Sequence, residues 1–379
     1  MSLSKGGNLF IGLKIVSLYD GISCGRIALE NAGYTVFSYH AFEIDKHAIA
    51  VSRFQYPDIT HHGNVLDADF YMLADTGIDL VIGGSPCTFW SIAKANREID
   101  KSGMGWRLFM RFVEAVRQIK PRYFLLENVA SMPNNIKTYI SEELDCEPVP
   151  INSALVSAQS RKRLYWTNIT GINQPADKGI LLKDILESGL PDQDKSHCIT
   201  ATYDGAVFWN SLERKQRSMV AEPIALADKS QTILSTLHKE NALSMMIRQK
   251  TGLFVAQPIV DGLGEVISSP VRIGEIGKGG QGNRVYSVQG KTVSIMANGG
   301  GRGAKTGLYK IDLPDGDYAI RKLTPVEAER CQTLPDNYTA WGIDDKGNTV
   351  KISNTQRYRA IGNGFTADVI AHILSHMKM

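Results

Sequence analysis

Short apolar runs alternate with segments of helical spacing between Lys14 and about Trp166. The apolar runs predict strands at residues 14–18, 35–42, 80–82, 123–126 and 154–156. The segments between them predict helices at residues 25–32, 45–55, 106–119 and 136–144. Such alternation is typical of βαβ units, so we expect an α/β fold with a doubly wound, mostly parallel sheet.

The regular pattern stops after about Thr170, where Gly, Ser, Thr and Pro separate short β-like runs. Three of these segments resemble one another, at residues 194–202, 228–236 and 290–298, and we interpret them as turn-plus-strand units of one irregular β-rich domain. Helical patterning returns at 325–333 and after Ala367. We therefore expect a discontinuous α/β domain, residues 9–170 and 353–379, with a smaller β-rich domain, residues 171–352, between its two parts.

The composition is that of a globular protein: 379 residues, of which 43% are hydrophobic and 21% charged. No apolar stretch approaches the roughly 18 residues of a membrane-spanning helix. The five cysteines are scattered and never spaced as C-x-x-C, which fits neither a disulfide framework nor a zinc site. These features predict a cytoplasmic protein with no metal site.

The net charge of +3 is too small to indicate a nucleic-acid partner by itself, but the charges are unevenly distributed. Between Pro270 and Lys310 there are seven basic residues, eleven glycines and a single acid, Glu275. This stretch predicts a positive surface suited to phosphate groups.

Chemically reactive side chains follow several of the predicted strands. Tyr19, Asp20 and Gly21 follow the first strand, Glu43 ends the second, and residues 83–87 follow the third. Because ligands bind outside the carboxyl ends of parallel strands, we expect these residues to meet at one site. Glu43 lies about twenty residues beyond the glycine turn, where a carboxylate can hold ribose hydroxyls.

Cys87 and Glu127 are the strongest candidates for chemistry. A single cysteine is more often a small buried hydrophobe, but Cys87 follows a Gly-Gly turn and a proline, where backbone N–H groups can stabilise a thiolate. Glu127 directly follows an apolar strand and is a candidate general acid.

Seven motifs in order then carry a family resemblance. They are residues 17–25 (SLYDGISCG), 42–45 (FEID), 84–87 (GSPC), 127–129 (ENV), 159–163 (QSRKR), 321–325 (RKLTP) and 362–364 (GNG). With them the chain resembles the DNA (cytosine-5)-methyltransferases over nearly its whole length. The resemblance implies the S-adenosylmethionine-dependent methyltransferase fold, with a target recognition domain in the variable stretch before Arg321.

The resemblance also implies a binding site for S-adenosylmethionine. Its residues would be Tyr19, Asp20, Gly21, Ile22, Ser23, Glu43, Ile44, Asn64, Val65, Pro86 and Asn363. Tyr19 would lie against the adenine, and Glu43 would hold the ribose. Asn64 stands where the family usually has an aspartate, and its side-chain oxygen can still accept the adenine amino group. Asp20, Ser23 and Cys24 in the first loop, and Thr88 after the cysteine, depart from many bacterial members. Together with Ser85 they make the motifs similar to the eukaryotic de novo type.

The implied chemistry explains the residue types. Cytosine C5 is a weak nucleophile, so a thiolate adds first at C6, which is the role implied for Cys87. Glu127 would protonate N3, while Arg161 and Arg163 would hold the base oxygen and support the glutamate and the nucleophile loop. Because C6 is stacked inside a duplex, the cytosine would be flipped out of the helix.

The expected partner is duplex DNA, bound by a monomer in the cleft between the two domains. Residues 88–105 would close over the flipped base. The expected DNA contacts are Thr88, Ser91, Arg97, Lys278, Arg284, Lys291 and Arg302. Whether a cognate restriction endonuclease exists is left open.

Three other functions share some of these sequence features. Residues 299–306 nearly match a Walker phosphate loop, but Ala304 replaces the second required glycine and no helix pattern follows. A catalytically silent DNA-binding subunit would not need Cys87, Glu127 and both arginines. A tRNA cytosine-5 methyltransferase would share the chemistry, although the long variable region favours reading of duplex DNA.

Overall fold

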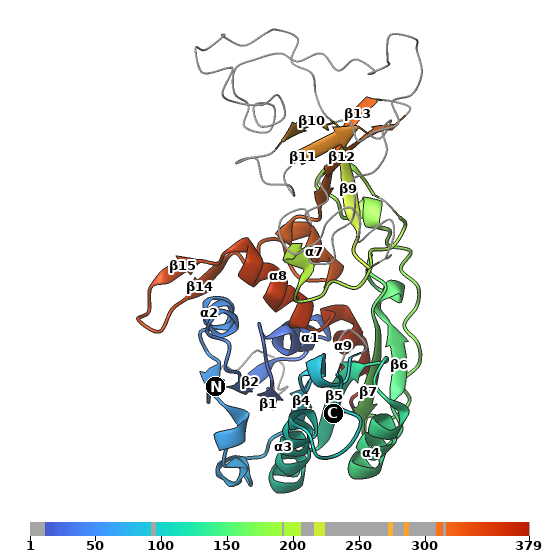
Figure 1. Ribbon diagram of the computed structural model, residues 1–379. Coiled ribbons are helices and arrows are strands. Elements are labelled where there is room, and N and C mark those ends of the chain that lie inside the picture. Colours follow the sequence, from blue (N-terminus) through green and yellow to red (C-terminus); the bar gives the residue numbers. More distant parts are fainter. Residues whose placement is uncertain are drawn as a thin grey trace, which may run out of the picture. The chain divides into compact units, whose positions relative to one another are not determined.

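The computed structural model describes residues 12–91, 96–191, 193–205, 216–223, 272–275, 284–287, 308–313 and 316–378 (Figure 1). The chain divides into two compact units. The larger comprises Met1–Ile185, Asp194–Asp204 and Thr324–Met379, and the smaller comprises Leu186–Gln193 and Gly205–Leu323.

A seven-stranded sheet forms the centre of the larger unit, in the order β3-β2-β1-β4-β5-β7-β6. Its strands are β1 (Leu13–Leu18), β2 (Val36–Phe42), β3 (Thr60–His61), β4 (Leu80–Gly83), β5 (Tyr123–Val129), β6 (Val149–Asn152) and β7 (Lys162–Thr167). The neighbours from β3 to β5 pair in parallel, whereas β7 is antiparallel to both β5 and β6. The predicted mostly parallel sheet is confirmed.

The predicted strand at 154–156 is wrong. Residues Ser153–Leu155 form a 3-10 turn between β6 and β7. Asn152 caps this turn, because its side chain accepts the N–H of Ala154 at 3.2 Å. A run of only three apolar residues could not reveal that a local cap competes with a strand.

Helices cover both faces of the sheet. The helices in the described part of the larger unit are α1 (Cys24–Asn31), α2 (Lys46–Gln55), α3 (Met104–Ile119), α4 (Asn134–Leu144), α7 (Pro325–Cys331), α8 (Asn354–Asn363) and α9 (Ala367–Leu374). Leu13 and Ile15 of β1 point into one apolar core with α1, α2 and α9, whereas Val16 and Leu18 point into a second core with α3 and α4. Because side chains alternate along a strand, β1 serves both cores and the sheet is doubly wound.

The part of the larger unit from Thr324 to Met379 is tied together by a buried ion pair. The Glu329 carboxylate, which is fully buried, accepts from Arg357 at 2.8 Å. Strands β14 (Trp341–Ile343) and β15 (Thr349–Lys351) form an antiparallel hairpin that packs against α2. Residues 324–352 therefore belong to the larger compact unit, while the division into a catalytic and a target recognition domain stays a prediction.

The smaller unit contains a six-stranded, mainly antiparallel sheet in the order β10-β11-β12-β13-β9-β8. Its strands are β8 (Leu190–Pro191), β9 (Met219–Pro223), β10 (Arg272–Glu275), β11 (Arg284–Ser287), β12 (Leu308–Leu313) and β13 (Gly316–Lys322). Only the pairing of β11 with β12 is parallel among these described strands. The prediction that the second domain is β-rich is confirmed.

The three similar segments do not form one set of strands. The segment 194–202 lies in the larger unit, where Ser196 N–H donates to the Ala158 carbonyl at 2.6 Å and Ser160 N–H to the Ser196 carbonyl at 2.8 Å. These two bonds form an isolated parallel bridge between Gln159 and Ser196 and no strand follows in this segment, so the turn-plus-strand prediction is wrong for it. The segments 228–236 and 290–298 lie outside the described residues.

A search of the described residues for a helix long and apolar enough to cross a membrane finds none.

Candidate functional site

The order of the strands creates a switch point, where open α/β sheets form their ligand-binding crevice. From β1 the chain first adds β2 and β3 on one side, and then crosses over to add β4 and β5 on the other side. Ligands of open α/β sheets bind at such a switch point, outside the carboxyl ends of the strands. The loops after β1, β4 and β5 all end at this edge.

The loop after β1 is a sharp turn with three residues of positive φ: Tyr19 (59°), Gly21 (60°) and Ser23 (61°). A Cβ atom added at Gly21 would meet nothing within 4 Å, so the turn opens into free space. Helix α1 begins directly after it, at Cys24. The turn therefore leaves room for a ligand to approach the backbone closely.

Glu43 holds this turn from the end of β2. One carboxylate oxygen accepts Gly21 N–H at 2.9 Å, and the other accepts the N–H groups of Ile44 and Asp45 at 2.7 and 2.8 Å. The Ile44 side chain is 73% exposed beside it. A fixed carboxylate and an exposed apolar side chain thus lie together at the rim of the crevice.

Asp20 supports the turn from inside the protein. Its carboxylate accepts the hydroxyls of Tyr39 at 2.7 Å and Ser23 at 2.6 Å, and Ser23 also pairs with Ser52 at 2.6 Å. Burial raises the pKa of Asp20 to about 6. Tyr39 and Ser52 were missed in the sequence, because nothing local shows that their hydroxyls reach the loop.

Tyr19 and Asn64 flank the same crevice. The Tyr19 hydroxyl donates to the Leu108 carbonyl of α3 at 2.6 Å, and burial raises its pKa. Asn64 caps the 3-10 turn Val65–Asp67, because its oxygen accepts Leu66 N–H at 3.1 Å. A carbonyl oxygen has two lone pairs, so one acceptor position of Asn64 is left beyond this cap.

The other residues predicted for the cofactor differ in exposure. Ile22 and Val65 are buried in the two apolar cores, Pro86 is half-buried before Cys87, and Asn363 is exposed at the end of α8. The first two therefore fix the loops through packing.

The loop that carries Cys87, residues 84–87, is fastened to the neighbouring strand. Cys87 opens a 3-10 turn, Cys87–Phe89, just after β4. The buried Asn128 amide on β5 donates to the Ser85 carbonyl and hydroxyl, both at 3.1 Å. A Cβ atom on Gly84 would lie 3.3 Å from Glu127 Oε2 and 2.7 Å from the Phe365 ring. The glycine therefore lets this loop lie directly against Glu127.

The electrostatics of Cys87 differ from the expectation. Burial and the nearby Glu127 carboxylate raise the pKa of its thiol, and the opposing effects of Arg163 and Arg161 are smaller. No hydrogen bond from a backbone N–H to its sulfur is found among the described residues. Burial therefore favours the neutral thiol here, and the stabilisation of a thiolate by backbone N–H groups stays a prediction.

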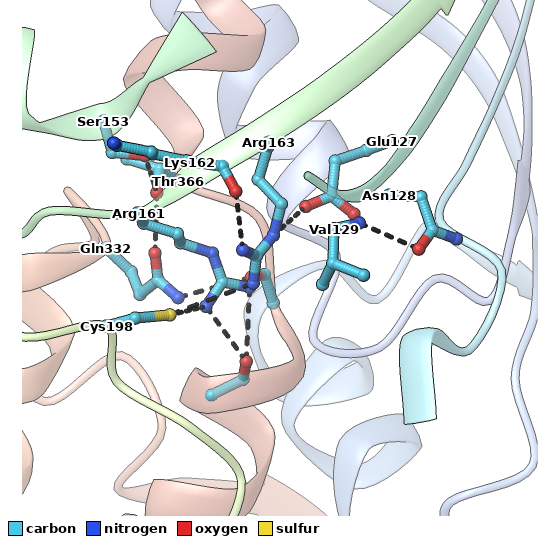
Figure 2. A network of polar contacts seen from close by, with 12 residues as sticks. Glu127, Asn128, Val129, Ser153, Arg161, Lys162, Arg163, Cys198, Gln332 and Thr366 are labelled. Carbon is cyan, nitrogen blue, oxygen red and sulfur yellow. Dashed lines mark hydrogen bonds and ion pairs between the residues drawn. The ribbon is translucent and has the colours of Figure 1, made fainter. Parts of the chain in front are cut away.

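Glu127 and Arg163 form an ion pair inside the site (Figure 2). Glu127 Oε1 lies 2.7 Å from Arg163 Nε, and each side chain is 11% exposed. The pair is set by the antiparallel register of β5 and β7, in which Val129 stands opposite Arg163. Arg163 is thus held beside the carboxylate, as expected from the sequence.

Arg161 has a different set of partners. It is 4% exposed and donates to the carbonyls of Ile199 at 3.1 Å, Gly362 at 3.3 Å and Gly364 at 3.0 Å. Arg161 therefore holds the last of the seven motifs, rather than the glutamate directly.

These observations agree with a comparison of the whole chain. The family model for the C-5 cytosine-specific DNA methylases matches residues 13–379. The chain belongs to this family.

Curated relatives of the methylase cover nearly the same length. The type II methyltransferase M.HhaI of Haemophilus parahaemolyticus is 26% identical over 96% of this chain and 93% of its own. The type II methyltransferase M.Sau3AI of Staphylococcus aureus is 24% identical over 95% and 94%, respectively. Methyltransferase activity on cytosine C5 is thus the activity of the family.

Solved structures share the fold. The S. pombe Dnmt2 methyltransferase superposes with a TM-score of 0.54 at 14% identity, covering 96% of this chain and 97% of the other. The Entamoeba histolytica methyltransferase EhMeth gives a TM-score of 0.55 at 13% identity over the same shares. Together with the central sheet, these likenesses identify the methyltransferase fold.

One residue of the methylase site was missed in the sequence. Cys198 lies on the segment Asp194–Asp204, which returns to the larger unit. Its sulfur accepts from Arg161 Nη1 at 3.3 Å and from Arg163 Nη2 at 3.9 Å. A Cβ atom on Gly362 would lie 2.2 Å from the Thr200 carbonyl carbon, so that glycine makes room for the segment. No spacing in the sequence could have indicated this contact.

The residues expected to contact DNA are only partly described. Thr88 is exposed, Ser91 N–H donates to the Cys87 carbonyl at 2.9 Å, and Arg97 donates to the Ser131 carbonyl at 3.0 Å. Arg284 begins β11, and its side chain is not described. Lys278, Lys291 and Arg302 lie outside the described residues. Their role in DNA binding stays a prediction.

Proposed function

We propose that this methylase transfers a methyl group from S-adenosylmethionine to C5 of a flipped cytosine in duplex DNA, through a covalent bond between Cys87 and C6. The observation that carries the proposal is the ion pair of Glu127 with Arg163 next to the Cys87 loop. A thiol, a carboxylate and a guanidinium at the ends of β4, β5 and β7 are the groups that this chemistry needs.

Each side chain has a role in the proposed reaction. The Cys87 sulfur adds to C6 as a thiolate, having lost its proton, and makes C5 nucleophilic. Glu127 contacts N3 and passes a proton from solvent to it as negative charge develops on the ring, and Arg163 steadies the carboxyl group. The methyl transfer leaves S-adenosylhomocysteine as the second product. Solvent then takes the C5 proton, N3 returns its proton to Glu127, and elimination of the Cys87 thiolate releases the methylated base.

The loops after β1 and β2 fit S-adenosylmethionine, which supplies an electrophilic methyl group when bound. The carboxylate of Glu43 is already fixed by three backbone N–H groups and suits the ribose hydroxyls. The exposed Ile44 side chain offers an apolar surface to the adenine. Since the Asp20 carboxylate is bonded inside the protein, we assign only the Asp20 backbone to the cofactor.

Duplex DNA is favoured over tRNA as the substrate. The curated relatives include type II methyltransferases by name, and the chain carries a basic, glycine-rich stretch between Pro270 and Lys310. A Dnmt2 methyltransferase among the solved structures keeps tRNA as the second candidate, because a shared fold does not decide whether the substrate is DNA or RNA. The retained Cys87, Glu127, Arg161 and Arg163 argue against a silent subunit.

We also propose a domain division, an oligomeric state and a partner for this enzyme. Residues 9–170 with 353–379 would supply the catalytic domain and residues 171–352 the target recognition domain. Within 171–352, the smaller compact unit, Leu186–Gln193 and Gly205–Leu323, would do the recognition, since the rest belongs to the larger unit. The enzyme would act as a cytoplasmic monomer. The type II relatives make a cognate restriction endonuclease the partner to look for.

The test compares tritiated methyl transfer to duplex DNA and to tRNA by the purified chain. Transfer to DNA alone supports the proposal, transfer to tRNA alone selects the second candidate, and transfer to neither contradicts both enzymatic assignments. Bisulfite sequencing of DNA from cells that express the protein would then give the methylated sequence.

A further inference from the structure

Cys198 lies beside Arg161 and Arg163, but the proposed reaction gives it no role. Its sulfur is within hydrogen-bond distance of two guanidinium groups, Arg161 and Arg163, and Figure 2 shows both arginines turned toward it. The thiol itself has only a weak acceptor, the Ile199 carbonyl at 3.7 Å. With two strong donors pointing at it and only one long bond that it can donate, the Cys198 sulfur is placed to act as a hydrogen-bond acceptor.

Without an anion at Cys198, the positive charges of Arg161 and Arg163 exceed the single negative charge of Glu127. Arg163 is paired with Glu127, but among the described residues no carboxylate pairs with Arg161, which is 4% exposed. Its carbonyl partners are neutral, and its buried Nε has no hydrogen-bond partner in the described part of the chain. A buried guanidinium is costly unless an anion lies nearby.

We propose that Cys198 is a positioning residue that, as a thiolate, supplies this anion and holds the guanidinium groups of Arg161 and Arg163 for the Glu127–Arg163 pair. The proposal rests on the function proposed above. The thiolate form is consistent with the neighbouring charges, since both arginines lower the pKa of Cys198 against the opposing effect of burial.

The segment that carries Cys198 is built to hold it in place. Gln159 accepts Ile199 N–H at 2.7 Å through its side-chain oxygen, and its amide donates to the Cys331 carbonyl at 2.9 Å. Gly362 lies against the Thr200 backbone on the other side. Residues from three distant parts of the chain thus fix the position of one sulfur atom.

Five titratable or charged groups act on the sulfur or on its neighbours. Arg161 and Arg163 favour the thiolate, while Cys87, Glu127 and Cys331 are the thiol and carboxyl groups on the surrounding elements. A negative charge on Cys198 also raises the pKa of Cys87. Removing that charge should therefore move the pH dependence of catalysis, which a merely structural cysteine would not do.

The direct test is a thiolate titration by ultraviolet absorbance in the Cys87→Ser protein. The other three cysteines should not titrate in the same range, because burial raises the pKa of the Cys24, Cys146 and Cys331 thiols. One thiolate titrating below the ordinary range of cysteine, and absent from the Cys87→Ser, Cys198→Ser double variant, is expected. Absence of that step from the Cys87→Ser protein would overturn the proposal, and this readout does not depend on methyl transfer.

The kinetic test compares Cys198→Ala, Cys198→Ser and Cys198→Asp, with Cys146→Ala as the matched cysteine control. We expect kcat to fall about tenfold in the alanine variant with little change in KM for the cofactor, because misplaced catalytic groups slow the chemical step. Aspartate should restore most of the rate because it restores the charge, and serine should restore less. The low-pH limb of the kcat/KM profile should shift to lower pH only where the charge is lost.

The outcomes separate this proposal from the function it rests on. If the wild type methylates DNA but alanine, serine and aspartate variants match its rate and pH profile, the positioning role is wrong and the proposed function stands. If the wild type transfers no methyl group to DNA, the proposed function fails, and the thiolate titration still decides the state of Cys198. If the alanine variant does not fold, the serine and aspartate variants carry the comparison.

Discussion

Glu127 Oε1 and Arg163 Nε lie 2.7 Å apart on neighbouring antiparallel strands, and each side chain is only 11% exposed. A single step of the register would turn one of these side chains to the opposite face of the sheet. The geometry of the pair is therefore a property of the fold, rather than of a flexible loop.

The first prediction concerns this pair. Glu127→Gln keeps the size of the side chain but removes its charge and its ability to pass a proton, so we expect methyl transfer to fall by about 10²-fold or more. Initial rates with saturating cofactor and DNA measure the effect. Glu143→Gln, which breaks an ion pair with the exposed Arg117, is the control and should keep the wild-type rate. Equal rates in the two variants would remove Glu127 from the mechanism.

The second prediction concerns the cofactor. In Glu43→Gln the amide end must face backbone N–H groups that now donate to the carboxylate, so the loop and its ribose contact are disturbed. Calorimetry should show affinity for S-adenosylmethionine weakened about tenfold, with DNA affinity unchanged. Glu30→Gln, on the exposed face of α1, should leave cofactor affinity as it is. Unchanged affinity in Glu43→Gln, or a comparable affinity for NAD, would contradict the assigned site.

The third prediction is a pH dependence of stability. Burial raises the pKa of Asp20 from its ordinary 3.8 to about 6, so the folded state holds this proton more tightly than the unfolded state. Stability from Asp20 is therefore full below pH 4 and falls as the pH rises to about 6. Relative to Asp20→Asn, the wild-type free energy of unfolding should fall by up to about 3 kcal/mol across that window. Denaturant unfolding at several pH values measures it, and a constant difference between the two proteins would contradict it.

Much of the fold and part of the site could be predicted from the sequence. The strands that carry the motifs have strong apolar patterns, and Cys87, Glu127 and Arg163 follow or lie within them. What could not be predicted depends on contacts between distant segments. Cys198 reaches the arginines only because its segment returns to the larger unit, and Tyr39 meets Asp20 only across two parallel strands. Such contacts leave no periodic or local signal.

The fourth prediction concerns the basic, glycine-rich stretch from Pro270 to Lys310. Alanine is placed at Lys278, Arg284, Lys291 and Arg302. Each lost phosphate contact should flatten the slope of log affinity against log salt by about one unit. The matched control places alanine at four positions of the larger unit, Lys120, Lys137, Lys346 and Lys351. If the first variant kept both the affinity and the slope, DNA recognition would have to lie elsewhere, such as residues 200–248.

The fifth prediction concerns the nucleophile. Cys87→Ser should abolish methyl transfer and keep cofactor and DNA binding, because a hydroxyl is a far weaker nucleophile at neutral pH than a partly ionised thiol. Cys146→Ala is the control for loss of a half-buried cysteine and should stay active. Near-normal turnover by the serine variant would rule out the covalent mechanism.

The most direct test of the central claim is covalent trapping on duplex DNA that contains 5-fluorocytosine at the methylated position. Fluorine at C5 blocks the final loss of the proton, so the bond between Cys87 and C6 cannot be released. With S-adenosylmethionine present, the wild type should form a denaturation-resistant complex with this DNA, and mass spectrometry of its peptides should place the base on Cys87. Absence of the complex under conditions in which unmodified DNA is methylated, or attachment at another residue, would contradict the account.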